Sequence, residues 1–186
     1  MTSLLQDLRR HVPVDEHEAR SLARIVAHVE GGGDLFDRRR WDGHLTGSAF
    51  LLDASGERLL LLFHRKLNRW LQPGGHGEPG ETDPLAVARR EALEESGIEG
   101  LALHPRIPTL FDVDVHRIPA WGEELAHEHL DLRYLFVAPP GATLAPAEGE
   151  SRQLAWVPLP EVAAISDASV ARAARKLLDR SASLVW

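Results

Sequence analysis

The chain of 186 residues contains no cysteine. This absence excludes disulfides, thiolate metal sites and catalytic cysteine nucleophiles. No apolar run approaches the roughly 18 residues that a membrane span needs, and the N-terminus lacks the hydrophobic segment of a signal peptide. From these absences we expect a cytoplasmic protein that has no membrane partner.

Clusters of positive charge are also scarce. The formal net charge is −7, and the longest basic run is Arg38-Arg39-Arg40. Because non-specific affinity for nucleic acid rests on clustered Lys and Arg, this balance argues against a nucleic acid duplex as partner. Apolar residues make up 44% and charged residues 26% of the chain, which is typical of one globular domain with a sizeable core.

One stretch, from Gly74 to Ile98, carries most of the chemical information. A loop rich in glycine comes first, and a helix pattern follows it. Asp83 is suited to cap the helix, since its carboxylate can accept hydrogen bonds from the free amides of the first turn. Pro84 is favoured at the first helical position, and Gly97 is favoured just after the last. The sequence therefore predicts one helix from Asp83 to Gly97.

Three glutamates share one face of this predicted helix. Glu91, Glu94 and Glu95 stand at helical spacings of three and four residues, so their carboxylates lie close together and repel. A hard divalent cation explains this arrangement, because Mg²⁺ prefers carboxylate oxygens and keeps water ligands for a phosphate substrate. Arg90 is placed to orient the carboxylates by charge-assisted hydrogen bonds. A different face, suited to packing on a sheet, carries Leu85, Ala88, Ala92 and Ser96.

The spacing of these residues resembles the signature of the Nudix hydrolases. Gly75 is followed after five residues by Glu81, and the run from Arg90 to Ile98 matches the helical part of the signature. The chain departs from the family pattern twice: eight residues separate Glu81 from Arg90, one more than usual, and Ala92 replaces a larger aliphatic residue. The first departure puts the role of Glu81 in question more than that of the helix carboxylates.

The resemblance implies roles for the signature residues. It implies that Glu94 and Glu95 are metal ligands, that Glu91 is a ligand or the general base, and that the carbonyl of Gly74 also binds the metal. In this family the base can instead come from a loop outside the signature, and Glu150 is a candidate there. The implied cofactor is Mg²⁺ or Mn²⁺, with Glu91, Glu94 and Arg90 as the catalytic group.

A second set of candidate residues lies on a predicted antiparallel hairpin, formed by 109–116 and 127–137. Both segments alternate between polar and apolar residues, as strands with one buried face do. One polar face would carry Asp112, Asp114, His116, His127, His129, Asp131 and Arg133. This face could bind substrate or, through its paired histidines, a transition metal; the alternative is the ordinary solvated face of an antiparallel sheet.

Four residues are candidates for substrate contact. Arg65 follows a predicted strand just upstream of the glycine loop and could contact phosphate. His129 and Arg133 belong to the polar hairpin face, and Trp121 in the hairpin loop could stack on a base. The alternative for each is an ordinary structural role, either at a solvated strand end or in packing.

Further patterns extend the predicted fold along the chain. Helices are expected over 2–30 with a break at Pro13, and again over 159–165 and 168–180; strands are expected over 48–53, 58–64 and 154–157. Together with the resemblance, this order predicts an α/β protein, a Nudix-type α/β/α sandwich with a mixed sheet. Residues 1–42 would form an N-terminal helical extension that packs on the domain 43–186 or makes a homodimer contact.

The leading functional interpretation is Mg²⁺-dependent hydrolysis of a diphosphate linkage in a nucleoside diphosphate derivative. Nucleoside triphosphates, oxidised nucleotides, ADP-ribose, nucleotide sugars and dinucleoside polyphosphates all remain open as the small-molecule substrate. One alternative is a binding or regulatory module that has kept the fold and lost catalysis, although the three helix carboxylates are intact. A diphosphate isomerase of the same fold is disfavoured, since the resemblance implies a catalytic cysteine for it.

Overall fold

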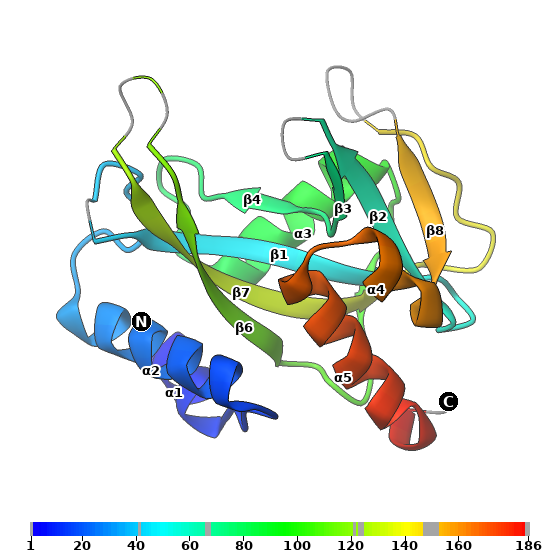
Figure 1. Ribbon diagram of the computed structural model, residues 1–186, viewed down its shortest axis with the longest axis horizontal. Helices are drawn as coiled ribbons and strands as arrows, with labels where there is room; N and C mark the ends of the chain where they lie inside the picture. The colour runs from blue at the N-terminus through cyan, green and yellow to red at the C-terminus, as the bar shows by residue number, and fades with distance from the viewer. Residues whose placement is uncertain are drawn as a thin grey trace.

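Among the residues that the structure describes, a mixed sheet of eight strands forms the centre of the protein (Figure 1). The computed structural model describes residues 2–40, 42–65, 68–120, 122, 125–146 and 153–184, so Trp121 and Glu150 lie outside the described residues. The strands are β1 (His44–Leu52), β2 (Arg58–His64), β3 (Arg69–Leu71), β4 (Gly74–His76), β5 (Ala102–Leu103), β6 (Leu110–Ile118), β7 (His127–Val137) and β8 (Leu154–Pro158).

The parallel pair of β1 and β7 is the axis of this sheet. Leu45 pairs with Leu130 and Phe50 with Leu135, and every residue of β1 is buried. The predicted hairpin of β6 and β7 is confirmed, since the two strands run antiparallel, and the expected strands over 48–53 and 58–64 form the antiparallel pair of β1 and β2. The run Leu59–Leu62 is buried throughout, as expected for a strand covered on both faces. The short strand β4 pairs with the first half of β1 and so holds the glycine loop against the sheet.

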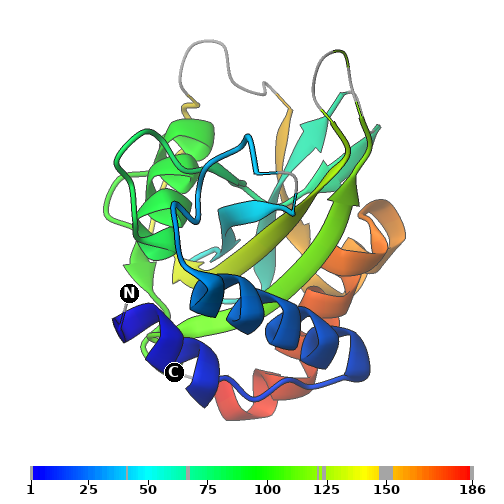
Figure 2. The same ribbon diagram turned by 90° about the vertical axis from the view of Figure 1, so that its left-hand side faces the viewer.

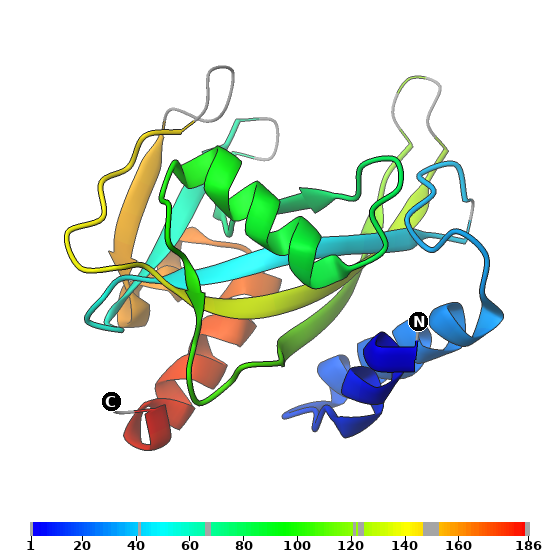
Figure 3. The same cartoon turned by 180° about the vertical axis from the view of Figure 1, so that it is seen from behind.

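Helices cover both faces of the sheet, which confirms the predicted α/β/α sandwich (Figures 2 and 3). On one face, α3 (Pro84–Ser96) shares a hydrophobic core with the first two helices, α1 (Thr2–Arg10) and α2 (Glu16–Gly31). On the other face, α5 (Ala168–Leu184) packs on a second core with the short helices η1 (Leu159–Glu161) and α4 (Val162–Ile165). Among the described helices, none combines the length and apolar character that a membrane crossing requires.

The N-terminal helices begin and end where local chemistry predicts. Asp15 caps α2, with its carboxylate accepting from the amide of Glu18 at 2.8 Å. Gly32 follows the helix with a φ of +69°, a conformation that glycine adopts without strain. Leu8 and Ile25 are completely buried and belong to the same core as α3, so the two helices complete the hydrophobic core on that face of the sheet.

Candidate active site

The glutamate-bearing helix α3 forms as the sequence predicts. The carboxylate of Asp83 accepts from the amide of Leu85 at 3.0 Å, and Pro84 occupies the first turn. Gly97 ends the helix in the left-handed conformation, and its amide donates to the carbonyl of Leu93 at 2.7 Å. These two ends fix the length of α3 and therefore the positions of its glutamates along it.

Small residues bring α3 unusually close to strand β1. Ala88 and Ala92 are completely buried in the core beneath the helix. Opposite them, a Cβ added to Gly47 of β1 would lie 2.4 Å from the carbonyl oxygen of Pro84. Thus Ala92, which departs from the family pattern, lies on the buried face that packs against the sheet.

Arg90 gathers the acidic groups of the site. Its Nη1 donates to Glu91 Oε1 and to Glu94 Oε2, both at 3.0 Å. Its Nη2 donates to the carbonyl of His76 at 2.8 Å, and both Nε and Nη2 donate to Glu81. The hydrogen bond to Glu81, together with the neighbouring Glu91 carboxylate, raises the pKa of Arg90 above its ordinary value, although burial opposes this shift.

Glu81 stays within this arrangement despite the longer spacing. The backbone of Asp83 is extended and α3 starts only at Pro84, so the additional residue is accommodated between Glu81 and the body of the helix. The Glu81 carboxylate accepts from Arg90 and from the amide of Glu78, the latter at 2.7 Å. The hydrogen bond from Arg90 lowers the pKa of Glu81, so this carboxylate is the charged partner of the arginine.

The glycine strand β4 lies directly against two of the helix carboxylates. The amide of Gly74 donates to Glu95 Oε2 at 2.9 Å. A Cβ added to Gly75 would lie 2.5 Å from Glu91 Oε1, so only glycine leaves room for this carboxylate. Carboxylate oxygens on α3 and backbone of β4 therefore form one oxygen-rich site, and the Glu94 side chain is 43% exposed. These hard oxygen donors beside solvent suit Mg²⁺ or Mn²⁺.

Comparison with known proteins identifies the family. The NUDIX domain matches residues 44–180, which includes the sheet, α3 and most of α5. The chain belongs to the NUDIX family. Its fold resembles a hydrolase of the NUDIX family from Clostridium perfringens, with 26% identity over 73% of this chain and 96% of that chain and a TM-score of 0.55. The protein is a Nudix pyrophosphohydrolase, an enzyme that acts on phosphoric anhydride bonds.

Two further structures share the fold of this Nudix enzyme at lower identity. An Ap4A hydrolase from C. elegans is 22% identical, with 75% of this chain and 98% of that chain covered and a TM-score of 0.55. A dihydroneopterin triphosphate pyrophosphohydrolase from E. coli is 18% identical, with 73% and 95% covered and a TM-score of 0.52. A search among curated proteins gave no match.

The substrate-contact candidates of the Nudix enzyme separate into different environments. Arg65 is exposed at the end of β2, where a phosphate could reach it. Arg133 is buried instead: only 2% of it is exposed, and its guanidinium donates to Asp131 at 2.8 Å, to Asp112 at 3.2 Å and to Ser169 of α5 at 2.7 Å. The donors of Arg133 are thus directed at groups inside the protein.

The polar hairpin face is only partly the solvated face that antiparallel sheets usually have, because its aspartates are buried. Asp112, Asp114 and Asp131 are almost completely buried, and side chains of α5 and α2 bond to the first two. Lys176 of α5 donates to Asp112 at 3.1 Å and also to Glu18 of α2. Nearby cations and hydrogen bonds lower the pKa of Asp114 despite its burial. Strand alternation alone cannot reveal this cover, because it depends on helices far away in the sequence.

Four histidines lie together at the other end of the polar hairpin face, away from the buried aspartates. His44 of β1 and His76 of β4 join His127 and His129 of β7, which sequence spacing had already paired. Burial, then the neighbouring histidines, lowers the pKa of His44 to about 4 and that of His129 to about 2. Sequence reasoning missed His44 and His76, since only the register of β1 with β7 and β4 brings them here.

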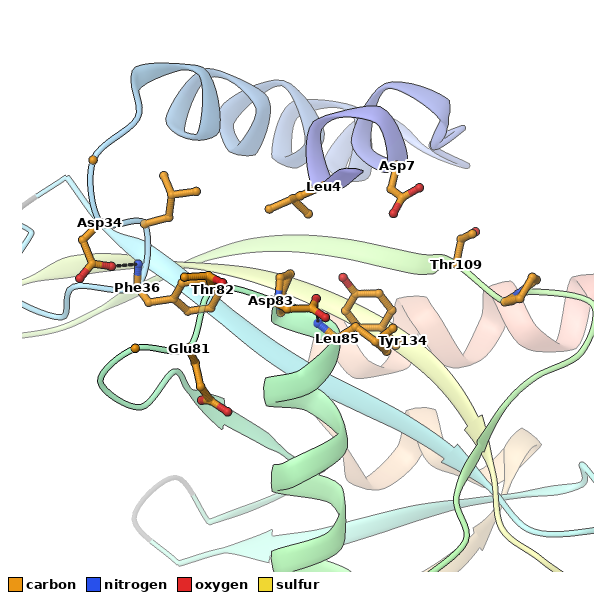
Figure 4. A pocket seen from close by; sticks show the side chains of 15 residues that line it. Leu4, Asp7, Asp34, Phe36, Glu81, Thr82, Asp83, Leu85, Thr109 and Tyr134 are labelled. Atoms are coloured by element: carbon orange, nitrogen blue, oxygen red, sulfur yellow. Dashed lines mark hydrogen bonds between the residues drawn. The ribbon is translucent and has the colours of Figure 1, made fainter. Parts of the chain in front are cut away.

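A pocket of about 740 Å³ lies between α1 and the N-terminal end of α3 (Figure 4). Leu4 of α1 and Tyr134 of β7 contribute apolar surface to it. Its charged lining is entirely acidic and comprises Asp7, Asp34, Glu81 and Asp83.

Proposed function

We propose that the protein hydrolyses a diphosphate linkage in a nucleoside diphosphate derivative with the help of Mg²⁺ or Mn²⁺. The observation that supports this is the arrangement of Glu91, Glu94 and Glu95 on one face of α3, next to the backbone of Gly74 and oriented by Arg90. The three carboxylates and the Gly74 carbonyl would hold the metal ion. When bound, the metal supplies charge neutralisation for the diphosphate and a lowered pKa for a water molecule.

The residues of the chain have separate tasks in this reaction. Water attacks one phosphorus, the bridging P–O bond breaks, and the leaving phosphate departs with the electron pair of that bond. Glu91 serves as a metal ligand or accepts the proton of the attacking water, and Glu150 is the alternative base. Arg90 keeps the carboxylates of Glu91 and Glu94 in place, and its own position is held by Glu81.

The substrate belongs to the nucleotide-type diphosphates in this proposal. The structural relatives named Ap4A hydrolase and dihydroneopterin triphosphate pyrophosphohydrolase are less than 25% identical, so they suggest compounds to test rather than a substrate. Arg65 and His129 remain our candidates for substrate contact. We also propose that residues 1–42 are an N-terminal extension of the hydrolase domain 43–186, with which they share a core.

A substrate panel with Mg²⁺ and Mn²⁺ tests the proposal. It should include nucleoside triphosphates, oxidised nucleotides, ADP-ribose, nucleotide sugars, Ap4A and dihydroneopterin triphosphate, with released phosphate measured after phosphatase coupling. We expect metal-dependent hydrolysis of at least one compound and its abolition by EDTA. Hydrolysis that continues unchanged in EDTA would contradict the proposed metal requirement.

Glutamine substitutions test the assignment of the site. Glu94→Gln and Glu95→Gln should each lower kcat by about 100-fold or more, because metal-assisted charge stabilisation contributes several kcal/mol. Glu99→Gln is the matched control, since Glu99 is an exposed glutamate just beyond the same helix. If both helix variants hydrolyse the substrate as fast as the control does, the metal assignment is wrong.

A further inference from the structure

β1 and β7 begin, and β4 ends, at the same end of the sheet (Figure 1). Four histidines form a cluster there. This histidine cluster consists of His44, His76, His127 and His129. His44 and His129 are direct partners in the parallel β1–β7 ladder, so their side chains leave the sheet on the same face. His76 pairs with Thr46, two residues along β1 from His44, which places it on that face as well.

The distances within the cluster are close to those of a metal site. Ligand nitrogens of His44, His127 and His129 all lie within 4.8 Å of one another. Nε2 of His76 lies 3.1 Å from Nε2 of His129. Two imidazole nitrogens bound to one tetrahedral zinc ion at about 2.0–2.1 Å are about 3.3 Å apart. Small side-chain adjustments are therefore enough to bring these nitrogens around one ion.

His44 supplies an independent observation. Only 1% of this residue is exposed, and neither of its ring nitrogens has a hydrogen-bond partner among the residues that the structure describes. Buried polar groups are nearly always paired, and leaving one without a partner is costly. A cation bound in the cluster would satisfy one of these nitrogens.

His127 is oriented as metal-binding histidines usually are. Its Nδ1 lies 2.8 Å from the carbonyl oxygen of Leu125, to which it can donate. Metal-ligating histidines typically donate one ring N–H to a carbonyl or carboxylate, which leaves the other nitrogen as the ligand. His76, His127 and His129 are partly exposed, so an ion can reach the cluster from solvent.

We propose that the histidine cluster binds a divalent transition-metal ion, with Zn²⁺ as the probe of choice. The donors are all imidazole nitrogens, which suit Zn²⁺, Ni²⁺ or Cu²⁺ and do not suit Mg²⁺. The site is chemically distinct from the carboxylates of α3, yet close to them: the carbonyl of His76 accepts from Arg90 at 2.8 Å. The Nudix enzyme would thus carry a metal site with nitrogen ligands next to its proposed metal site with oxygen ligands, here called the oxygen site.

Metal titration of the full-length protein tests this proposal. After removal of metals with EDTA, the protein is titrated with Zn²⁺ by calorimetry in excess Mg²⁺, which occupies the oxygen site. We expect one equivalent of Zn²⁺ to bind. Co²⁺ should give the strong visible absorption of a nitrogen-rich, four-coordinate ion, and Zn²⁺ should displace it. A weak octahedral spectrum, or displacement of Zn²⁺ by Mg²⁺, would overturn the proposal.

Substitutions separate the two sites. His127→Asn with His129→Asn should weaken Zn²⁺ binding by more than about 100-fold, since even the loss of an outer partner of a metal ligand costs about 10–100-fold. His64→Asn, on β2 outside the cluster, is the matched control and should bind Zn²⁺ normally. The Glu94→Gln, Glu95→Gln double variant should also keep the zinc equivalent. The assignment of Zn²⁺ to the histidine cluster is contradicted if the glutamine double variant loses Zn²⁺ binding. It is also contradicted if the asparagine double variant binds Zn²⁺ as tightly as the unsubstituted protein does.

A measurement on the unsubstituted protein guards against misfolding of the variants. In imidazole ¹⁵N spectra, one equivalent of Zn²⁺ should shift the ring nitrogens of cluster histidines and leave that of His64 in place. If the signals of the cluster histidines do not move, no metal binds there. The role of these histidines is then confined to packing or to contact with substrate.

Discussion

Arg90 and Glu81 are joined by two hydrogen bonds, from Nε at 3.2 Å and from Nη2 at 3.1 Å. Paired bonds between a guanidinium and a carboxylate are strong and directional. Because the same guanidinium also holds Glu91 and Glu94, Glu81 acts through Arg90 on two carboxylates that we propose as metal ligands. Glu81 is thus a positioning residue in the proposed site.

Removing the Glu81 carboxylate should misplace Arg90. We expect Glu81→Ala to lower kcat about 10–100-fold, the usual cost of losing an outer partner, and to raise the Mg²⁺ concentration needed for half-maximal rate. The free energy of unfolding should change by about 1 kcal/mol or less, because the pair is partly exposed. Steady-state kinetics at varied Mg²⁺ measure the effect. Glu78→Ala, in the same loop, is the control, and equal behaviour of the two variants would refute the positioning role.

Gly75 should tolerate no side chain. The Cβ of a Gly75→Ala variant would lie 2.5 Å from Glu91 Oε1, so the carboxylate must move from its place in the proposed metal site. We expect hydrolysis to fall by about 100-fold or more, since small misplacements near the chemistry have effects of this size. The control is Gly31→Ala, where an added Cβ meets nothing within 4 Å. Normal kinetics of Gly75→Ala would mean that the Glu91 position seen here is not the active one.

The glutamate-bearing helix α3 could be predicted from sequence because its signals are local. Asp83, Pro84 and Gly97 mark its ends, and the spacing of its glutamates fixes their common face. The burial of Arg133 and the meeting of His44 with His129 could not be predicted in this way. They depend on strand register and on which helix covers which face, and both are set by packing between distant parts of the chain.

Lys176 is a clear example of such long-range packing. It lies on the buried face of α5, next to Leu177, and donates to Glu18 of α2 and to Asp112 and the Phe111 carbonyl of β6. A lysine at this position would ordinarily be expected at the surface. Its charge instead joins two helices and a strand inside the protein, where an unpaired carboxylate is costly.

Loss of the Lys176 charge should therefore destabilise the fold. We expect Lys176→Met to lower the free energy of unfolding by about 3–5 kcal/mol, because Glu18 and Asp112 lose a buried partner. Urea unfolding measures this change. Arg175→Met, an exposed neighbour on the same helix, should change stability by about 0.5 kcal/mol or less. Adding Glu18→Gln to Lys176→Met should recover part of the lost free energy of unfolding, because the buried carboxylate charge is then removed as well. If the effects of the two substitutions on the free energy of unfolding simply add, Glu18 and Lys176 are not coupled.

Stability should depend on pH through His44. Burial, followed by the charges of His76 and His127, lowers the pKa of His44 from 6.5 to about 4 in the folded protein. Between these values the unfolded chain binds more protons than the folded one, so the free energy of unfolding rises with pH. The contribution is fully present above pH 6.5 and is lost as the pH falls towards 4, by up to about 3 kcal/mol.

A His44→Leu variant should flatten this pH dependence, because leucine takes up no proton on unfolding. The measurement is urea unfolding between pH 4.5 and about 7 in EDTA, which keeps metal binding out of the comparison. As the pH falls, the unsubstituted protein should lose more free energy of unfolding than the His44→Leu variant does. Parallel curves over the whole range would mean that His44 is protonated as readily in the folded state as in the unfolded chain.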